Sequence, residues 1–136
     1  VRPRLVAHLD PAYLPSIRGN TESEYLFAAL RQILADDPDL AVETALAELM
    51  RRIERWVDGC RSLLTIVVSD GKRLYAVRHA LGDSCPTLYY TTDDEAFPNA
   101  QLIASERMND SPFWQIVPEH RILILDPEKP PELLSL

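Results

Sequence analysis

Two cysteines and three histidines are the residues of this chain that could act as nucleophiles, general bases or soft metal ligands. Cys60 follows a segment that we expect to be helical, and the negative end of a helix dipole disfavours a thiolate. Cys85 precedes Pro86 in an expected loop close to Asp83, whose charge again disfavours a thiolate. We therefore expect neither cysteine to be a catalytic nucleophile.

The spacing of these residues also argues against a metal site. Neither cysteine lies in a C-x-x-C pattern or beside a histidine, and His8, His79 and His120 are far apart in the sequence. We expect no metal ligands and no cofactor. Two free thiols are typical of a reducing compartment, so the expected location is the cytoplasm.

An acidic group lies where a helix is expected to begin. The segment Thr21-Glu22-Ser23-Glu24 matches a capping box, in which the Thr hydroxyl and the later Glu carboxylate satisfy free backbone N–H groups. An acid in the first turn, such as Glu22, also favours the helix dipole, so a purely structural role accounts for it at this point.

Two amphipathic helices are expected to position this group. Apolar residues recur at helical spacing behind Thr21, and Asp36-Asp37-Pro38 ends that segment. A second apolar stripe runs over Leu40–Val57, with Gly59 as its stop. Residues 1–20 contain three prolines, which predict an extended segment without helix.

After Gly59 the pattern changes to that of short strands. We expect strands over Leu63–Ser69, Leu74–Arg78, Leu88–Thr92, Gln101–Ser105 and Arg121–Asp126. Asp70-Gly71 is a hairpin-type dipeptide, and three prolines predict a loose tail after Asp126. Helices followed by a run of strands predict an α+β fold with an antiparallel sheet, and 1–136 as one domain or the C-terminal part of one.

Three stretches, read together, resemble one family. Residues 19–27, Gly-Asn-Thr-Glu-Ser-Glu-Tyr-Leu-Phe, resemble the G-x-T-D-S-E-x-L-F type of helix start in class II glutamine amidotransferases. Leu63–Arg78 is similar to that family's hairpin, with a Ser-Asp-Gly turn and a return strand ending in Arg. Ile103–Pro118 resembles the A-S-E-P-L-x-D stretch followed by W-x-x-V-P, with Arg107 in place of the first Pro. The resemblance is greatest to the small single-domain branch that includes the ergothioneine-pathway amidohydrolase and the amidotransferase-like subunit of glutathione-degrading complexes.

The resemblance implies a fold and a reaction. The fold is the αββα sandwich of N-terminal-nucleophile hydrolases, with two antiparallel sheets face to face and helices outside. The reaction is attack of an N-terminal cysteine on the γ-carbonyl of glutamine, with its own α-amino group as base and an Asn-Gly pair as oxyanion donors. Val1 carries no nucleophilic side chain, and the sequence has no Asn-Gly pair. The chain therefore resembles the C-terminal portion of the domain and is expected to be inactive alone, with no catalytic residue of its own.

The resemblance also implies a binding site for a γ-glutamyl amide. Glu22, beside Thr21, occupies the position of the family Asp that holds the α-amino group of glutamine. Glu22 is one methylene longer, so the ammonium would sit elsewhere and glutamine itself becomes less certain as the substrate. Arg78 is expected either to meet a carboxylate or to end a strand at the surface. Ser105-Glu106 is expected to form a polar turn, and Trp56 and Trp114 to be core or interface anchors.

Two functions stay open at this stage. One is a γ-glutamyl amide hydrolase whose cysteine segment lies outside this chain, and the other is a non-catalytic binding or scaffold module of the same fold. Either would expose sheet edges and apolar surface to a complementary N-terminal segment, a partner chain or a second copy. The net charge of −7 and scattered basic residues argue against nucleic acid, and no apolar run is long enough for a membrane span.

Overall fold

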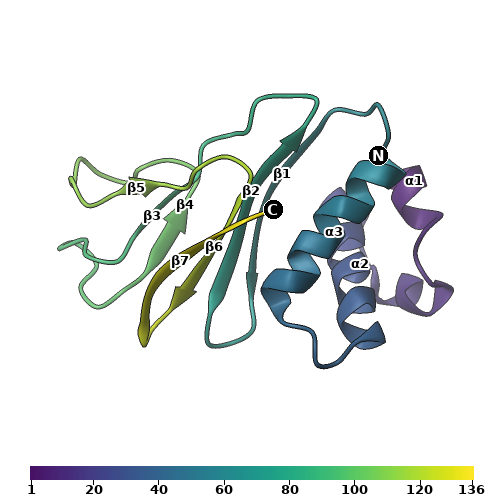
Figure 1. The fold of residues 1–136 in the computed structure, drawn as a ribbon, viewed down its shortest axis with the longest axis horizontal. Coiled ribbons are helices and arrows are strands. Elements are labelled where there is room, and N and C mark those ends of the chain that lie inside the picture. Colours follow the sequence, from purple (N-terminus) through teal and green to yellow (C-terminus); the bar gives the residue numbers. More distant parts are fainter. The chain divides into compact units, whose positions relative to one another are not determined.

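The computed structural model describes Val1–Leu136 as a mixed protein of helices and antiparallel sheets (Figure 1). The chain divides into two compact units, the helical residues Val1–Cys60 and the strand-containing residues Arg61–Leu136. The predicted α+β class is confirmed, while the assignment of 1–136 to one domain or part of one stays a prediction. None of the helices combines the length and apolar character needed to span a bilayer.

The helical unit contains α1 (Arg2–Val6), a 3₁₀ helix (Pro11–Ser16), α2 (Glu22–Asp36) and α3 (Val42–Trp56). Helices α2 and α3 run side by side, and α1 contacts both of them (Figure 1). The buried side chains recur three or four residues apart, as Ala29 and Ile33 do in α2 and Leu46, Leu49 and Ile53 do in α3. Both predicted helices are confirmed, with slightly different ends.

The prediction that residues 1–20 form an extended segment is wrong. Pro3 and Pro11 lie in the first turns of α1 and the 3₁₀ helix, where a missing backbone N–H costs little. The Asp10 side chain caps the 3₁₀ helix by accepting a 2.8 Å hydrogen bond from the backbone N–H of Ala12. Helices this short do not develop the 3.6-residue periodicity that revealed α2 and α3.

The strand-containing unit holds two antiparallel sheets. One has the order β1 (Ser62–Ser69), β2 (Leu74–Leu81), β6 (Arg121–Asp126) and β7 (Lys129–Ser135). The other has the order β4 (Leu102–Ala104), β3 (Tyr89–Thr91) and β5 (Gln115–Ile116). The five predicted strands are confirmed with shifted ends, whereas β5 and β7 were not predicted.

Strand β7 forms despite its two prolines, so the prediction of a loose tail is wrong. It lies at the edge of its sheet, where one row of backbone N–H groups needs no partner. The register jumps between the Ile124–Glu132 and Asp126–Lys129 pairs, which places Pro130 and Pro131 together opposite Leu125 in a bulge. The prolines therefore fall where the ladder is already interrupted.

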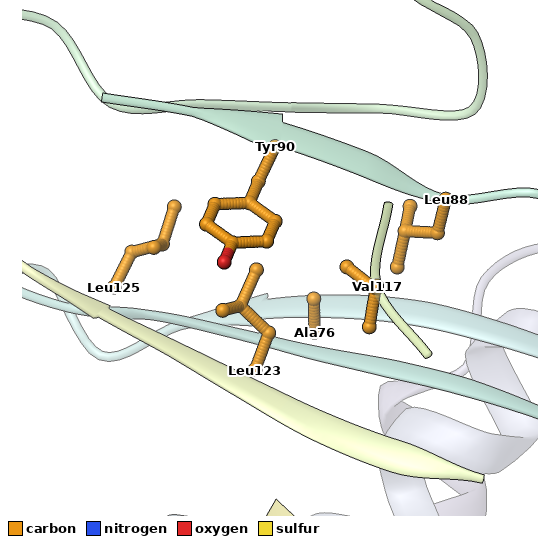
Figure 2. Packing of buried hydrophobic residues seen from close by; sticks show 6 residues of the cluster. All are labelled: Ala76, Leu88, Tyr90, Val117, Leu123 and Leu125. Carbon is orange, nitrogen blue, oxygen red and sulfur yellow. The ribbon is translucent and has the colours of Figure 1, made fainter. Parts of the chain in front are cut away.

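A buried cluster joins the two sheets (Figure 2). Ala76, Leu123 and Leu125 point from β2 and β6 towards Tyr90 and Leu88, which lie in and beside β3. Val117 closes the cluster after β5 and donates its backbone N–H to the Leu88 carbonyl at 2.8 Å. The polar hydroxyl of Tyr90 has a hydrogen-bond partner outside the apolar cluster, because it donates to Gln115 Oε1 at 2.9 Å. These contacts pack the sheets face to face.

Replacing Leu123 with alanine tests this core. The side chain is 0% exposed, so Leu123→Ala should lower the free energy of unfolding by about 2–5 kcal/mol through lost burial and a cavity. Leu133 pairs with it across the strands but is 42% exposed, and Leu133→Ala should cost less than about 1 kcal/mol. Urea unfolding followed by circular dichroism measures both. Equal losses in the two variants would refute the packing described here.

Candidate functional site

The start of α2 is the first candidate site. Thr21 is the N-cap, with extended backbone angles of −80° and 145°, and Glu22 begins the helix. The two predicted site residues thus lie side by side at the positive end of a helix dipole. Both side chains are exposed to solvent, and that of Glu22 is 57% accessible.

The capping box predicted at this start does not form. The Thr21 side chain makes no capping hydrogen bond and instead donates to Glu24 Oε1 at 3.4 Å. Glu24 reaches past the N-cap, where its Oε2 accepts from the backbone N–H groups of Arg18 at 3.0 Å and Gly19 at 2.9 Å. The hydrogen bond from Gly19 is the main reason that the pKa of Glu24 is lowered.

Gly19 is needed for this arrangement. A Cβ atom at that position would lie 2.2 Å from Glu24 Oε1, so any other residue would push the carboxylate away. Glu24 and Gly19 therefore fix the turn that leads into α2. The carboxylate of Glu22 takes no part in this local network. The backbone nitrogen of Val1 lies 3.8 Å from its Oε1.

The hairpin between β1 and β2 turns through four residues, Asp70–Arg73, which are the residues that the predicted strands leave between them. Gly71 takes the left-handed φ of 95° that the turn requires. Asp70 Oδ1 accepts from the backbone N–H groups of Lys72 at 2.9 Å and Arg73 at 2.7 Å, and Oδ2 accepts from the Tyr75 hydroxyl at 3.0 Å. These hydrogen bonds, with that from Arg73 first, lower the pKa of Asp70 to about 2.

Charged side chains bind the hairpin to the β6–β7 turn. Arg73 Nε donates to Asp126 Oδ2 at 2.7 Å, and Lys72 Nζ donates to Glu128 Oε2 at the same distance. Asp126 is buried, and its pKa is lowered first by the backbone N–H of Glu128 and then by Arg73. The hairpin is thus a structural element, as its Asp-Gly dipeptide predicted.

Arg78 lies inside β2 and is 6% exposed, so its placement at an exposed strand end is wrong. Its Nε donates to the carbonyl of Pro86 at 2.7 Å, Nη1 to that of Val117 at 2.7 Å, and Nη2 to that of Cys85 at 3.3 Å. The alternative, a carboxylate partner, is confirmed by Glu119, whose Oε1 lies 3.7 Å from Nη2. Arg78 holds two loops against one strand.

The third motif stretch follows β4 and is mainly structural. Ser105 and Glu106 form the exposed polar turn that was predicted, and the Thr87 hydroxyl donates to the Ser105 carbonyl at 2.9 Å. The Arg107 guanidinium lies 5.9 Å from the centre of the Tyr89 ring, a stacking contact that proline could not make. Trp114 is buried as predicted, and its Nε1 donates to Asn109 Oδ1 at 3.0 Å.

The remaining reactive residues have very different surroundings. Cys60 follows α3, and His8 stacks on the half-buried Trp56 with ring centres 4.9 Å apart. His79 and His120, which are distant in sequence, meet with their Nδ1 atoms 2.8 Å apart, and the Cys85 sulfur lies 3.9 Å from His120 Nδ1. Sequence spacing missed this group. In the antiparallel pairing of β2 with β6, Arg78 lies opposite Arg121, so the adjacent residues His79 and His120 come together. A correct prediction of this pairing would have revealed the group.

Comparison with solved structures identifies the fold. A glutamine aminotransferase class-II domain protein from Silicibacter pomeroyi superposes with a TM-score of 0.73 at 23% sequence identity. The match covers 98% of this chain and 59% of that one. The chain has a class II glutamine amidotransferase-like fold. No family model and no curated protein matches its sequence.

The hairpin carboxylate predicts a pH dependence of stability. Because the folded-state pKa of Asp70 is lowered to about 2, its ionised form stabilises the fold above about pH 4, and that contribution is lost as the pH falls towards 2. The urea midpoint of Asp70→Asn should thus lie below that of the wild type at neutral pH and converge with it between about pH 4 and 2. Exposed Asp39 gives the control, Asp39→Asn. A gap that stays constant down to pH 2 would contradict the assignment.

Proposed function

We propose that this chain supplies the substrate-ammonium site of a hydrolase that cleaves glutamine or another γ-glutamyl amide. The observation that carries the proposal is the exposed carboxylate of Glu22 in the first turn of α2, within a class II glutamine amidotransferase-like fold. The positive end of the helix dipole disfavours a cation at this position. The carboxylate of Glu22 would nevertheless attract an α-ammonium through a charge-assisted hydrogen bond.

The nucleophile would come from a segment that this sequence does not include. The chain spans 59% of the matched structure, so part of that fold has no counterpart here. In the proposed reaction a cysteine thiolate of the additional segment attacks the γ-carbonyl and expels the amine, which takes a proton from the cysteine's α-ammonium. Water then hydrolyses the thioester to glutamate and restores the thiol. This chain would bind and orient the substrate.

The length of Glu22 bears on where the γ-glutamyl group would be held. A glutamate reaches one methylene further than the aspartate of the family pattern, so the bound α-ammonium would lie further from the helix start. The γ-carbonyl would shift with it, and catalysis tolerates such a shift poorly. Because every γ-glutamyl amide has the same atoms between the α-ammonium and the γ-carbonyl, Glu22 would select for the γ-glutamyl group, and we propose this whole class of amides, glutamine included, as the substrate.

The strand-containing unit offers a surface for the additional segment. Leu63 and Val67 of β1 pair with Ala80 and Ala76, so they share the face that packs on the second sheet. They are nevertheless 58% and 48% exposed, because the second sheet does not extend over β1. Strands of the upstream segment that widen the second sheet would cover them and complete an αββα sandwich.

A non-catalytic module of the same fold is the alternative function. The exposed side chains of Leu63 and Val67 support it, since an uncovered apolar surface can bind a partner without any catalysis. Such a module would use the same uncovered face of β1 to bind its partner. It would not require the carboxylate of Glu22.

Substitution of Glu22 separates these functions. In the protein that carries the upstream segment, Glu22→Gln should lower kcat/KM for γ-glutamyl amide hydrolysis by about 10- to 100-fold, the value of one hydrogen bond to a charged group. Glu43 occupies the first turn of α3 and provides the control Glu43→Gln, which loses the same favourable charge at a helix start. Equal activities of the two variants would show that Glu22 acts only on the helix dipole.

The uncovered face of β1 predicts self-association of the isolated chain. Light scattering should give a mass above that of the monomer that rises with concentration, and Leu63→Glu with Val67→Glu should return it to the monomer. Phe27 is also exposed, at 54%, but lies on α2, so Phe27→Glu is the matched control. A chain that stays monomeric at every concentration would rule out an unfinished sheet face.

A further inference from the structure

Four side chains that could bind a metal ion come together in the strand-containing unit. His79 belongs to β2, Cys85 to the loop after β2, and Glu119 and His120 to the turn before β6. The two Nδ1 atoms are 2.8 Å apart, and the Cys85 sulfur is 3.9 Å from His120 Nδ1. One ligand atom from each of Cys85, Glu119 and His120 lies within 4.8 Å of the others. We call these four residues the thiol–imidazole cluster.

The backbone holds His120 in place. Its N–H donates to the Arg78 carbonyl at 2.8 Å, and its carbonyl accepts from the N–H of Leu136 at 3.2 Å. Its φ of 57° lies in the left-handed region, which costs energy for any residue other than glycine and persists only where the surroundings impose it. The imidazole is thus aimed at Cys85 and His79 by a strained backbone.

Arg78 helps to fix two further members, Cys85 and Glu119. Its guanidinium donates to the carbonyls of Cys85 and Pro86, which sets the position of the thiol, and it pairs with the Glu119 carboxylate at 3.7 Å. Ligating carboxylates in protein metal sites are commonly held by outer partners of this kind. The cluster is therefore organised by the fold itself.

The set of donor atoms selects the metal. A thiolate, two imidazole nitrogens and a carboxylate suit zinc, whereas magnesium and calcium prefer oxygen alone. In tetrahedral zinc sites sulfur and nitrogen ligands lie about 3.6 Å apart and two nitrogens about 3.3 Å apart. The Cys85–His120 and His79–His120 separations of 3.9 Å and 2.8 Å are close to these values. Cys85, Glu119 and His120 already lie within 4.8 Å of one another, and His79 has to turn towards Cys85 and Glu119 to join them.

We propose that the thiol–imidazole cluster binds one zinc ion through Cys85 Sγ, His79 Nδ1, His120 Nδ1 and the Glu119 carboxylate. Binding releases the thiol proton to solvent, and the imidazole that donates between the Nδ1 atoms changes to its Nε2–H tautomer. Four protein ligands leave no open position for a substrate, so the ion is structural. It joins β2 to the two loops that Arg78 holds, and this role is independent of γ-glutamyl amide hydrolysis.

Cobalt and zinc titrations of the untagged, chelator-treated chain test the site. Cobalt should bind with a stoichiometry of one and produce a sulfur-to-cobalt charge-transfer band, and zinc should displace it and raise the midpoint of thermal unfolding. Cys85→Ser should abolish the band and weaken zinc binding by more than about 100-fold, because loss of a ligand exceeds the 10- to 100-fold effect of an outer partner. His120→Asn should weaken binding similarly.

The second free cysteine provides the matched control. Cys60→Ser should keep the charge-transfer band and the zinc affinity of the wild type, and far-ultraviolet circular dichroism should show the same fold in all variants. No saturable binding by the wild type would overturn the proposal. So would zinc binding that survives Cys85→Ser, or a charge-transfer band that disappears with Cys60→Ser.

Discussion

A buried charge in β2 organises the strand-containing unit. The Arg78 guanidinium is shielded from water, and burying a charge is costly unless hydrogen bonds compensate for it. Its partners are the carbonyls of Cys85, Pro86 and Val117, so the loop after β2 and the segment after β5 are drawn to one strand. Because Val117 also fills the core between the sheets, the same residue that satisfies the charge helps to join the two sheets.

The elements that could be predicted are those with a repeated local pattern. The long helices α2 and α3 have apolar stripes, and β1 and β2 are rich in branched residues around an Asp-Gly turn. The elements that were missed depend on tertiary context. Strand β7 forms because its prolines fall opposite Leu125 in an edge bulge, and two-residue β5 exists only through its pairing with β3. A short sequence window reports neither the position of an edge bulge nor the pairing of strands that are distant in sequence.

The same distinction applies to the candidate sites. Thr21 and Glu22 could be placed at a helix start because such a start has a local signature. The capping box did not form, because the Glu24 carboxylate accepts hydrogen bonds from Arg18 and Gly19 instead. The thiol–imidazole cluster was missed because its members come from distant segments. Only the pairing of β2 with β6 and the left-handed backbone of His120 bring them together. Spacing along the chain does not report such contacts.

The central claim is that this fold serves γ-glutamyl amide hydrolysis through a cysteine of a segment upstream of this sequence. The most direct test is the intact mass and N-terminal sequence of the protein from its own source, before and after treatment with a γ-glutamyl diazoketone. We expect a longer chain that begins with cysteine and gains one adduct at that residue. A protein that begins at Val1, or one that gains no adduct, would contradict the claim.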